Sequence, residues 1–173
     1  PLSADYIDLI TDIEKEDYID NLAISHFLVP HTKPLPNDPG GGGAPMSVDH
    51  AWYLNSLSLY DAWEISTGDP SVKIALIDDG FYTNDLDIIN DQSLNWNAVT
   101  LTNNVTPVGP SHGTSMSSII ASRTNNNLDM FGIAGGWSGV GGCNTFMVSI
   151  GQNFQEWAID DAIYKAVTNG ARV

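Results

Sequence analysis

The sequence predicts an α/β domain in which a parallel sheet is flanked by helices. Two near-continuous apolar runs, residues 72–77 and 146–150, are bounded by turn residues, as is typical of strands covered on both faces. Helical patterns over residues 115–121 and 157–167 follow elements of this kind. Strands that alternate with helices indicate a layered domain with a parallel sheet.

The first 46 residues differ from the rest of the chain. Residues 1–30 are acidic and mildly amphipathic, with a short helix expected near residues 12–19. Residues 30–45 contain five prolines and four consecutive glycines, and this composition is typical of a linker or a long surface loop. We therefore expect an amino-terminal extension at 1–46 and a second domain at 47–173.

The elements of the second domain follow in order. A short helix is expected over residues 61–68, because a glycine ends its pattern. The apolar run 72–77 then forms the first strand, and the helix 115–121, the strand 146–150 and the helix 157–167 follow it. Residues 171–173 resemble the opening of a further strand.

Composition excludes several classes of function. Six basic and 21 acidic residues give a net charge of −15, which repels phosphate backbones and argues against nucleic-acid binding. The acidic excess fits either solubility alone or a secreted protein that binds Ca²⁺. No run approaches the roughly 18 apolar residues of a membrane helix, and a signal peptide, if there was one, is expected to have been removed before Pro1. The single Cys143 is expected to be a buried structural thiol rather than a nucleophile.

Two short segments contain residues suited to catalysis. Asp78 follows the first apolar run, at the sheet edge where open parallel sheets bind ligands, although Asp and Gly there also suit a simple turn. His112 precedes Gly113 at the start of a helix, where its imidazole is presented outward, although a lone histidine is more often a surface or cap residue. A carboxylate near such a histidine would hold its tautomer and stabilise its charge.

Five segments, taken in order, resemble the subtilisin-like serine protease family. They are residues 60–69 (YDAWEISTGD), 72–80 (VKIALIDDG), 112–121 (HGTSMSSIIA), 132–135 (GIAG) and 158–173. The resemblance implies a subtilisin-like sandwich that is incomplete in this chain, a secreted endopeptidase, and residues 1–46 as an extension or propeptide remnant. It implies that Asp78 orients His112, the general base. Residues 151–155 match a region that lines the non-primed side of the substrate cleft.

The resemblance also raises the question of the serine. Residues 113–116 read like the nucleophile motif of the family, but Ser115 is rejected, because residues three apart at one helix start do not give triad geometry with an oxyanion hole. The catalytic serine and the oxyanion asparagine are expected in a carboxy-terminal segment that docks near Val173, so this chain alone is predicted to be inactive. Asp79 stands where the family usually has Ser or Thr, and its charge is expected to raise the basicity of His112.

Calcium is a further implication of the resemblance. Asp85 and the Asn126 loop match the segments that supply oxygen ligands in the family, and such oxygens suit a hard cation. Zinc is not expected, because the sequence has no His/Cys cluster. The expected partners are a peptide or protein substrate and the serine-bearing segment, with no nucleic acid or membrane. Two alternatives stay open: a non-catalytic peptide- or protein-binding module on a subtilase-like fold, and a metal-binding α/β domain.

Overall fold

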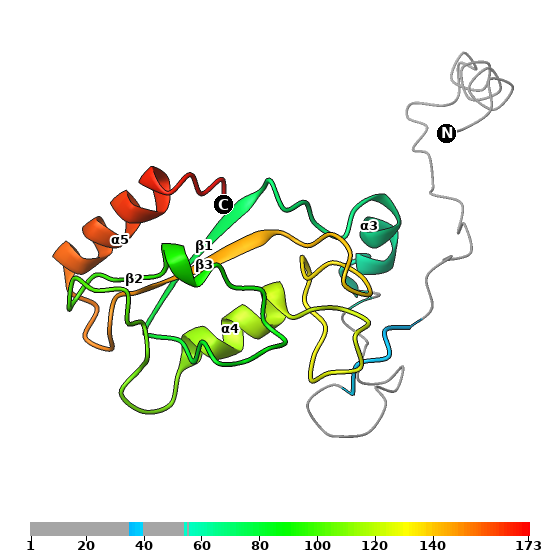
Figure 1. The fold of residues 1–173 in the computed structure, drawn as a ribbon, viewed down its shortest axis with the longest axis horizontal. Coiled ribbons are helices and arrows are strands. Elements are labelled where there is room, and N and C mark those ends of the chain that lie inside the picture. Colours follow the sequence, from blue (N-terminus) through cyan, green and yellow to red (C-terminus); the bar gives the residue numbers. More distant parts are fainter. Residues whose placement is uncertain (1–34, 40–53, 55) are drawn as a thin grey trace, which may run out of the picture. The chain divides into compact units, whose positions relative to one another are not determined.

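The computed structural model describes residues 35–39, 54 and 56–173 (Figure 1). The predicted helix near residues 12–19 and the predicted boundary at residue 46 lie outside these residues. The elements in chain order are α3 (Leu59–Ile65), β1 (Lys73–Asp78), the 3₁₀ helix η1 (Gln92–Leu94), β2 (Trp96–Asn97), α4 (His112–Ala121), β3 (Asn144–Ser149) and α5 (Glu156–Thr168).

The sheet is parallel, with strand order β1-β3-β2. Leu76 of β1 lies opposite Met147 of β3, and Asn97 of β2 lies opposite Ser149. The predicted parallel α/β architecture is therefore confirmed. Each predicted strand is shifted by one or two residues, and Asp78 is the last residue of β1 rather than the first residue beyond it.

The two longer strands are covered on both faces by α4 and α5 (Figure 1). Side chains of β3 alternate between the two layers, as strand geometry requires. Phe146 and Val148 pack with Ala158 and Ala162 of α5, while Met147 packs toward the α4 side. All three β3 side chains are fully buried, which explains the near-continuous apolar run in the sequence.

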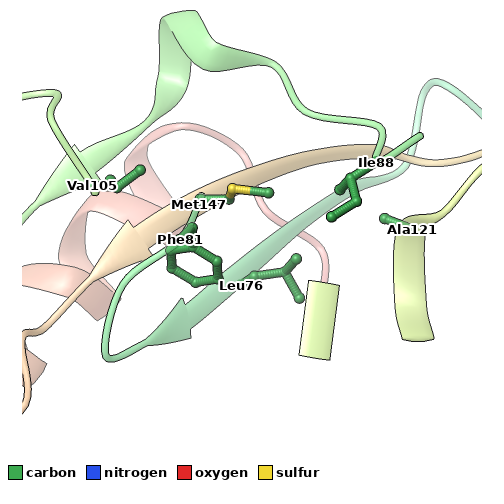
Figure 2. Packing of buried hydrophobic residues seen from close by; sticks show 6 residues of the cluster. All are labelled: Leu76, Phe81, Ile88, Val105, Ala121 and Met147. Atoms are coloured by element: carbon green, nitrogen blue, oxygen red, sulfur yellow. The ribbon is translucent and has the colours of Figure 1, made fainter. Parts of the chain in front are cut away.

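The α4 side of the sheet has its own apolar core. Met147 and Leu76, from the paired strands, share this core with Phe81 and with Ala121 at the end of α4 (Figure 2). Burial of a large apolar side chain contributes about 1.5–3 kcal/mol. This core fixes the position of α4 against β1, and the residues discussed below lie where these two elements meet.

The helix α3 anchors a separate aromatic cluster. Trp63 is 2% exposed, packs edge-on against Phe131 and Trp137, and donates its indole N–H to the Ile133 carbonyl at 2.9 Å. The helix was predicted over residues 61–68 but spans Leu59–Ile65. It therefore starts two residues earlier and ends before the glycine.

Residues 171–173, where the opening of a strand was expected, are not assigned to a strand, but their backbone is hydrogen-bonded to β1. The amide of Ala75 donates to the Val173 carbonyl at 3.0 Å, and the amide of Arg172 donates to the Lys73 carbonyl at 2.9 Å. The amides of Asn144, at the start of β3, and of Ile150, just beyond its end, bond to the carbonyls of Val72 and Asp78 instead. Residues 171–173 therefore lie along the opposite edge of β1.

Two further findings concern the composition-based expectations. Cys143 is buried, as predicted. In the part of the chain that the structure describes, no helix combines the length and the apolar character that crossing a membrane requires.

Candidate active site

Asp78 lies at the carboxyl end of β1. Its side chain is only 16% exposed, and its Oδ1 accepts a 2.7 Å hydrogen bond from the amide of Asp79. The pairing of β1 with β3 continues to this residue, where Asp78 lies opposite Ser149. A rigid strand therefore holds the carboxylate at the edge of the sheet.

His112 is the first residue of α4, and Ser111 is the N-cap. The Ser111 hydroxyl accepts hydrogen bonds from the Thr114 amide at 3.1 Å and donates one to the Gly80 carbonyl. Ser is a favoured N-cap because its oxygen satisfies an amide that has no partner within the helix. The same hydroxyl ties the helix start to the turn that follows β1, which places His112 beside Asp78.

Asp78 and His112 form a carboxylate–imidazole pair. The Nδ1 atom of His112 lies 2.8 Å from Oδ2 and 3.0 Å from Oδ1 of Asp78. A carboxylate accepts only, so Nδ1 carries the proton and the neutral ring has a free lone pair on Nε2. The His112 side chain is 68% exposed, whereas its partner is mostly buried. The pair thus presents an oriented basic nitrogen to solvent.

Gly113 permits the close approach of α4 to β1. A Cβ atom at this position would lie 2.4 Å from the Gly80 carbonyl oxygen and 2.9 Å from the Cβ of Asp78. No side chain larger than hydrogen fits without movement of the backbone. The glycine next to the histidine therefore has a steric role that the sequence motif alone does not reveal.

Asp79 extends toward the amides at the start of α4. Its Oδ2 accepts a hydrogen bond from the His112 amide at 3.2 Å, and its Oδ1 accepts one from the Gly113 amide at 3.1 Å. The structure thus places the Asp79 carboxylate against main-chain atoms of His112 rather than in a hydrogen bond with the imidazole. The expected effect of Asp79 on the basicity of His112 stays a prediction.

Ser115 lies on the exposed side of α4. The hydrogen bonds of the His112 ring in the described residues go to Asp78, not to Ser115. The rejection of Ser115 as the nucleophile stays a prediction.

An open pocket of about 250 Å³ lies beside Asp79, the residue that follows Asp78. It is lined by Asp79, the 106–108 loop and the turn after β3, including Gly151 and Gln152. Of the residues predicted to line a substrate cleft, 151–155, the first three line this pocket beside Asp79.

The candidate metal ligands lie in a second polar cluster. Asn126 donates its side-chain amide to Oδ1 of Asp87 at 2.7 Å, while Asp85 accepts a hydrogen bond from the Asp87 amide at 2.9 Å. The carboxylate that accepts the side-chain amide of Asn126 is therefore that of Asp87, which is 1% exposed and which the sequence did not predict. Burial raises the pKa of Asp87 above its ordinary value, against the opposing hydrogen bond from Asn126.

Asp38, in the segment predicted to be a linker, joins this cluster. Its carboxylate is fully buried and accepts the amides of Asn125 at 2.7 Å and Asn126 at 3.0 Å. Neither buried carboxylate forms an ion pair with another described residue. No group of three or more His, Cys, Asp or Glu side chains suited to a metal occurs within residues 35–39, 54 and 56–173, so any cation here would also need amide or carbonyl oxygens.

The fold and the paired side chains define a class: parallel α/β domains with an Asp–His pair at the carboxyl edge of the sheet. Residues 69–173 match the Subtilase family, and this match covers well over half of the chain. The chain therefore belongs to the subtilase family of serine peptidases, and the family resemblance seen in the sequence is confirmed. A search among curated proteins found no significant match.

Proposed function

We propose that this chain supplies the aspartate and the histidine of a subtilisin-like serine endopeptidase. The observation that supports this most directly is the 2.8 Å contact between Asp78 Oδ2 and Nδ1 of the exposed His112 ring. In this role His112 removes the proton from a serine hydroxyl as it attacks a peptide carbonyl and then protonates the leaving amine. Asp78 holds the tautomer and stabilises the imidazolium.

The nucleophile and the oxyanion asparagine belong, in this proposal, to a carboxy-terminal segment. An apolar pocket of about 190 Å³ next to Asp78 supports a docking position for it. The pocket lies between β1 and α4 and includes Leu76, Phe81, Met116 and Ile120. A segment with an apolar face that fills this pocket would bring a serine close to His112, and the chain without that segment would have no peptidase activity.

The substrate is proposed to be a peptide or a protein. An open pocket formed by Asp79, the 106–108 loop and residues 151–153 supports this, because it lies next to the residue that follows Asp78 and has room for a side chain of a bound peptide. The acidic composition and family membership support a secreted enzyme, with residues 1–46 as an amino-terminal extension or propeptide remnant.

A serine-directed fluorophosphonate probe tests this function in the full-length protein that contains this chain. We expect labelling of wild type, and labelling rates about 10⁴-fold lower for Asp78→Asn, because Asn leaves the wrong tautomer at the histidine. His112→Ala is expected to lose a similar factor, since it removes the base. Ser115→Ala is the matched control on the same helix, and it is expected to be labelled like wild type.

Two results would decide against the proposal. Absence of labelling in the full-length wild type would favour a non-catalytic peptide- or protein-binding module on the same fold. Loss of labelling in Ser115→Ala would instead make Ser115 the nucleophile and remove the need for another segment. Where wild type is labelled, mapping the labelled peptide by mass spectrometry identifies the serine.

A structural calcium ion is proposed at the cluster of Asp38, Asp87 and Asn126. The chemistry of the donors supports a hard cation, since two buried carboxylates without a cationic partner among the described residues meet one asparagine loop. Their oxygens accept N–H groups of Asn125, Asn126 and Met130 in this structure, so a bound ion would have to replace some of these hydrogen bonds. Asp85, the residue expected from the sequence, accepts the Asp87 amide, whereas Asn126 is hydrogen-bonded to Asp87. The bound ion would neutralise the buried carboxylates and fix the loop against residues 37–38.

Thermal melting of the chelator-treated protein tests this site. Titration with CaCl₂ is expected to raise the midpoint in wild type and to have little effect on Asp87→Asn, because that variant lacks one anionic ligand. Asp91→Asn, an acidic residue outside the cluster, is the control and is expected to respond like wild type. Equal responses of wild type and Asp87→Asn would place the ion elsewhere.

A further inference from the structure

The residue after the catalytic aspartate links the sheet to the histidine helix. Asp79 is held at its backbone from two sides: its amide donates to Asp78 Oδ1 at 2.7 Å, and its carbonyl accepts the Ser149 hydroxyl at 3.1 Å. From this fixed point, its carboxylate reaches across to α4. It accepts the amides of His112 and Gly113 at 3.2 and 3.1 Å.

These two amides belong to the first turn of α4 and have no acceptor within the helix. The next amide, that of Thr114, is satisfied by the N-cap Ser111. Asp79 and Ser111 together satisfy three successive amides. A carboxylate is well suited to this position, since it also interacts favourably with the positive end of the helix dipole.

We propose that Asp79 is a positioning residue that holds the His112 backbone, and thereby the imidazole, in register with Asp78. The inference rests on the proposed peptidase function. Asp78 and Asp79 are consecutive on one rigid backbone, so one aspartate fixes the ring of His112 and the next fixes its main chain. Rotation of the helix start would break the contact of the His112 ring with Asp78 and that of the His112 amide with Asp79 at the same time.

This role differs from a direct electrostatic effect of Asp79 on the ring. Both carboxylate oxygens are engaged with main-chain amides, so removal of the acceptor releases the helix start. A misplacement of about 1 Å at a reacting group costs about 10²-fold in rate. The loss should therefore appear in kcat and depend on an oxygen acceptor, not on the charge alone.

The test compares Asp79→Leu and Asp79→Asn in the full-length enzyme. Asp79→Leu keeps the approximate size without an acceptor, and its kcat is expected to fall about 10²-fold. Asp79→Asn keeps one acceptor oxygen and is expected to lose only about tenfold. The acidic limb of its pH–rate profile should stay where it is in wild type. Asp69→Leu is the matched control, because the Asp69 carboxylate accepts the Ser71 amide within the loop before β1, and it is expected to leave kcat unchanged.

Hydrogen exchange at the amides of His112 and Gly113 gives a readout that does not need activity. Exchange should speed up in Asp79→Leu, less so in Asp79→Asn, and not in Asp69→Leu. Unchanged exchange in Asp79→Leu would overturn the proposal, as would an Asp79→Asn variant with wild-type kcat and a shifted acidic limb. If wild type is not labelled by the fluorophosphonate, the peptidase function fails, and the exchange data still decide whether Asp79 holds the helix start.

Discussion

Substitution of Gly113 by Ala tests whether the contact between α4 and β1 is as tight as the structure indicates. In an open helical position this change would stabilise the protein by about 1 kcal/mol, because Ala is the better helix former. At Gly113, however, the new Cβ would lie 2.4 Å from the Gly80 carbonyl oxygen and 2.8 Å from a ring carbon of Phe81. Helix propensity and steric overlap therefore predict opposite signs.

The magnitude follows from the type of contact. Overpacking a buried site typically costs about 1–3 kcal/mol, and the upper end applies here because one clashing atom belongs to the backbone and cannot rotate away. After subtraction of the propensity gain, we expect a net loss of about 2 kcal/mol. For a domain of this size the melting midpoint should fall by about 4–8 °C.

Thermal and urea unfolding measure this change, with Ser115→Ala as the control two residues along the same helix. Ser115 is exposed, so its replacement should be neutral or stabilising by a few tenths of a kcal/mol. Because the clash separates α4 from β1, Gly113→Ala should also weaken the hydrogen bond between His112 and Asp78, which NMR of the Nδ1 proton detects. A Gly113→Ala variant more stable than wild type, with that proton signal unchanged, would refute the steric reasoning.

Three further results are expected. Phe146→Ala should lower the free energy of unfolding by about 3–5 kcal/mol in urea denaturation, since the fully buried ring fills the core beneath α5. Phe146→Leu should lower the free energy of unfolding by less, because Leu fills more of the same space. Equal losses for the two variants would contradict this packing. Asp91→Asn should destabilise at neutral pH, because the Ser93 hydroxyl and amide hold the pKa of Asp91 below its ordinary value. Because the pKa of Asp91 is lowered in the folded state, this stabilisation is present above the ordinary pKa range of a carboxyl group and is lost as the pH falls through the folded-state pKa. The difference in melting midpoint between wild type and Asp91→Asn should therefore shrink from pH 7 to acidic pH. A difference that stays constant with pH would exclude this cause.

The sequence is most informative where local pattern and burial coincide. The apolar runs around Leu76 and Met147 predict buried parallel strands, because a strand covered on both faces has no polar side to alternate with. The same pattern places Asp78 at a strand end, and the short motif after Ser111 predicts a helix start at His112. Each of these inferences needs only residues that are neighbours in the chain.

The sequence is less informative where long-range contacts decide. β2 has only two residues, Trp96 and Asn97, which is too short for any periodicity. Asp87 rather than Asp85 accepts the side-chain amide of Asn126, because the loop after β1 turns the Asp87 carboxylate inward. This contact joins residues about 40 positions apart in the sequence, so local sequence does not predict it. The burial of Asp38 has the same origin, since its partners lie 87 and 88 residues further along the chain.

The sequence by itself determined the α/β class, the family, and the two residues expected to act as a pair. Only the tertiary structure decided that Asp78 and His112 lie within hydrogen-bond distance, that Gly113 is required by the closeness of two elements, and that the Asp79 carboxylate binds the helix start. The physical reason is that side-chain type and spacing are written in the chain, whereas the direction of a side chain depends on which distant backbone groups the fold brings within its reach.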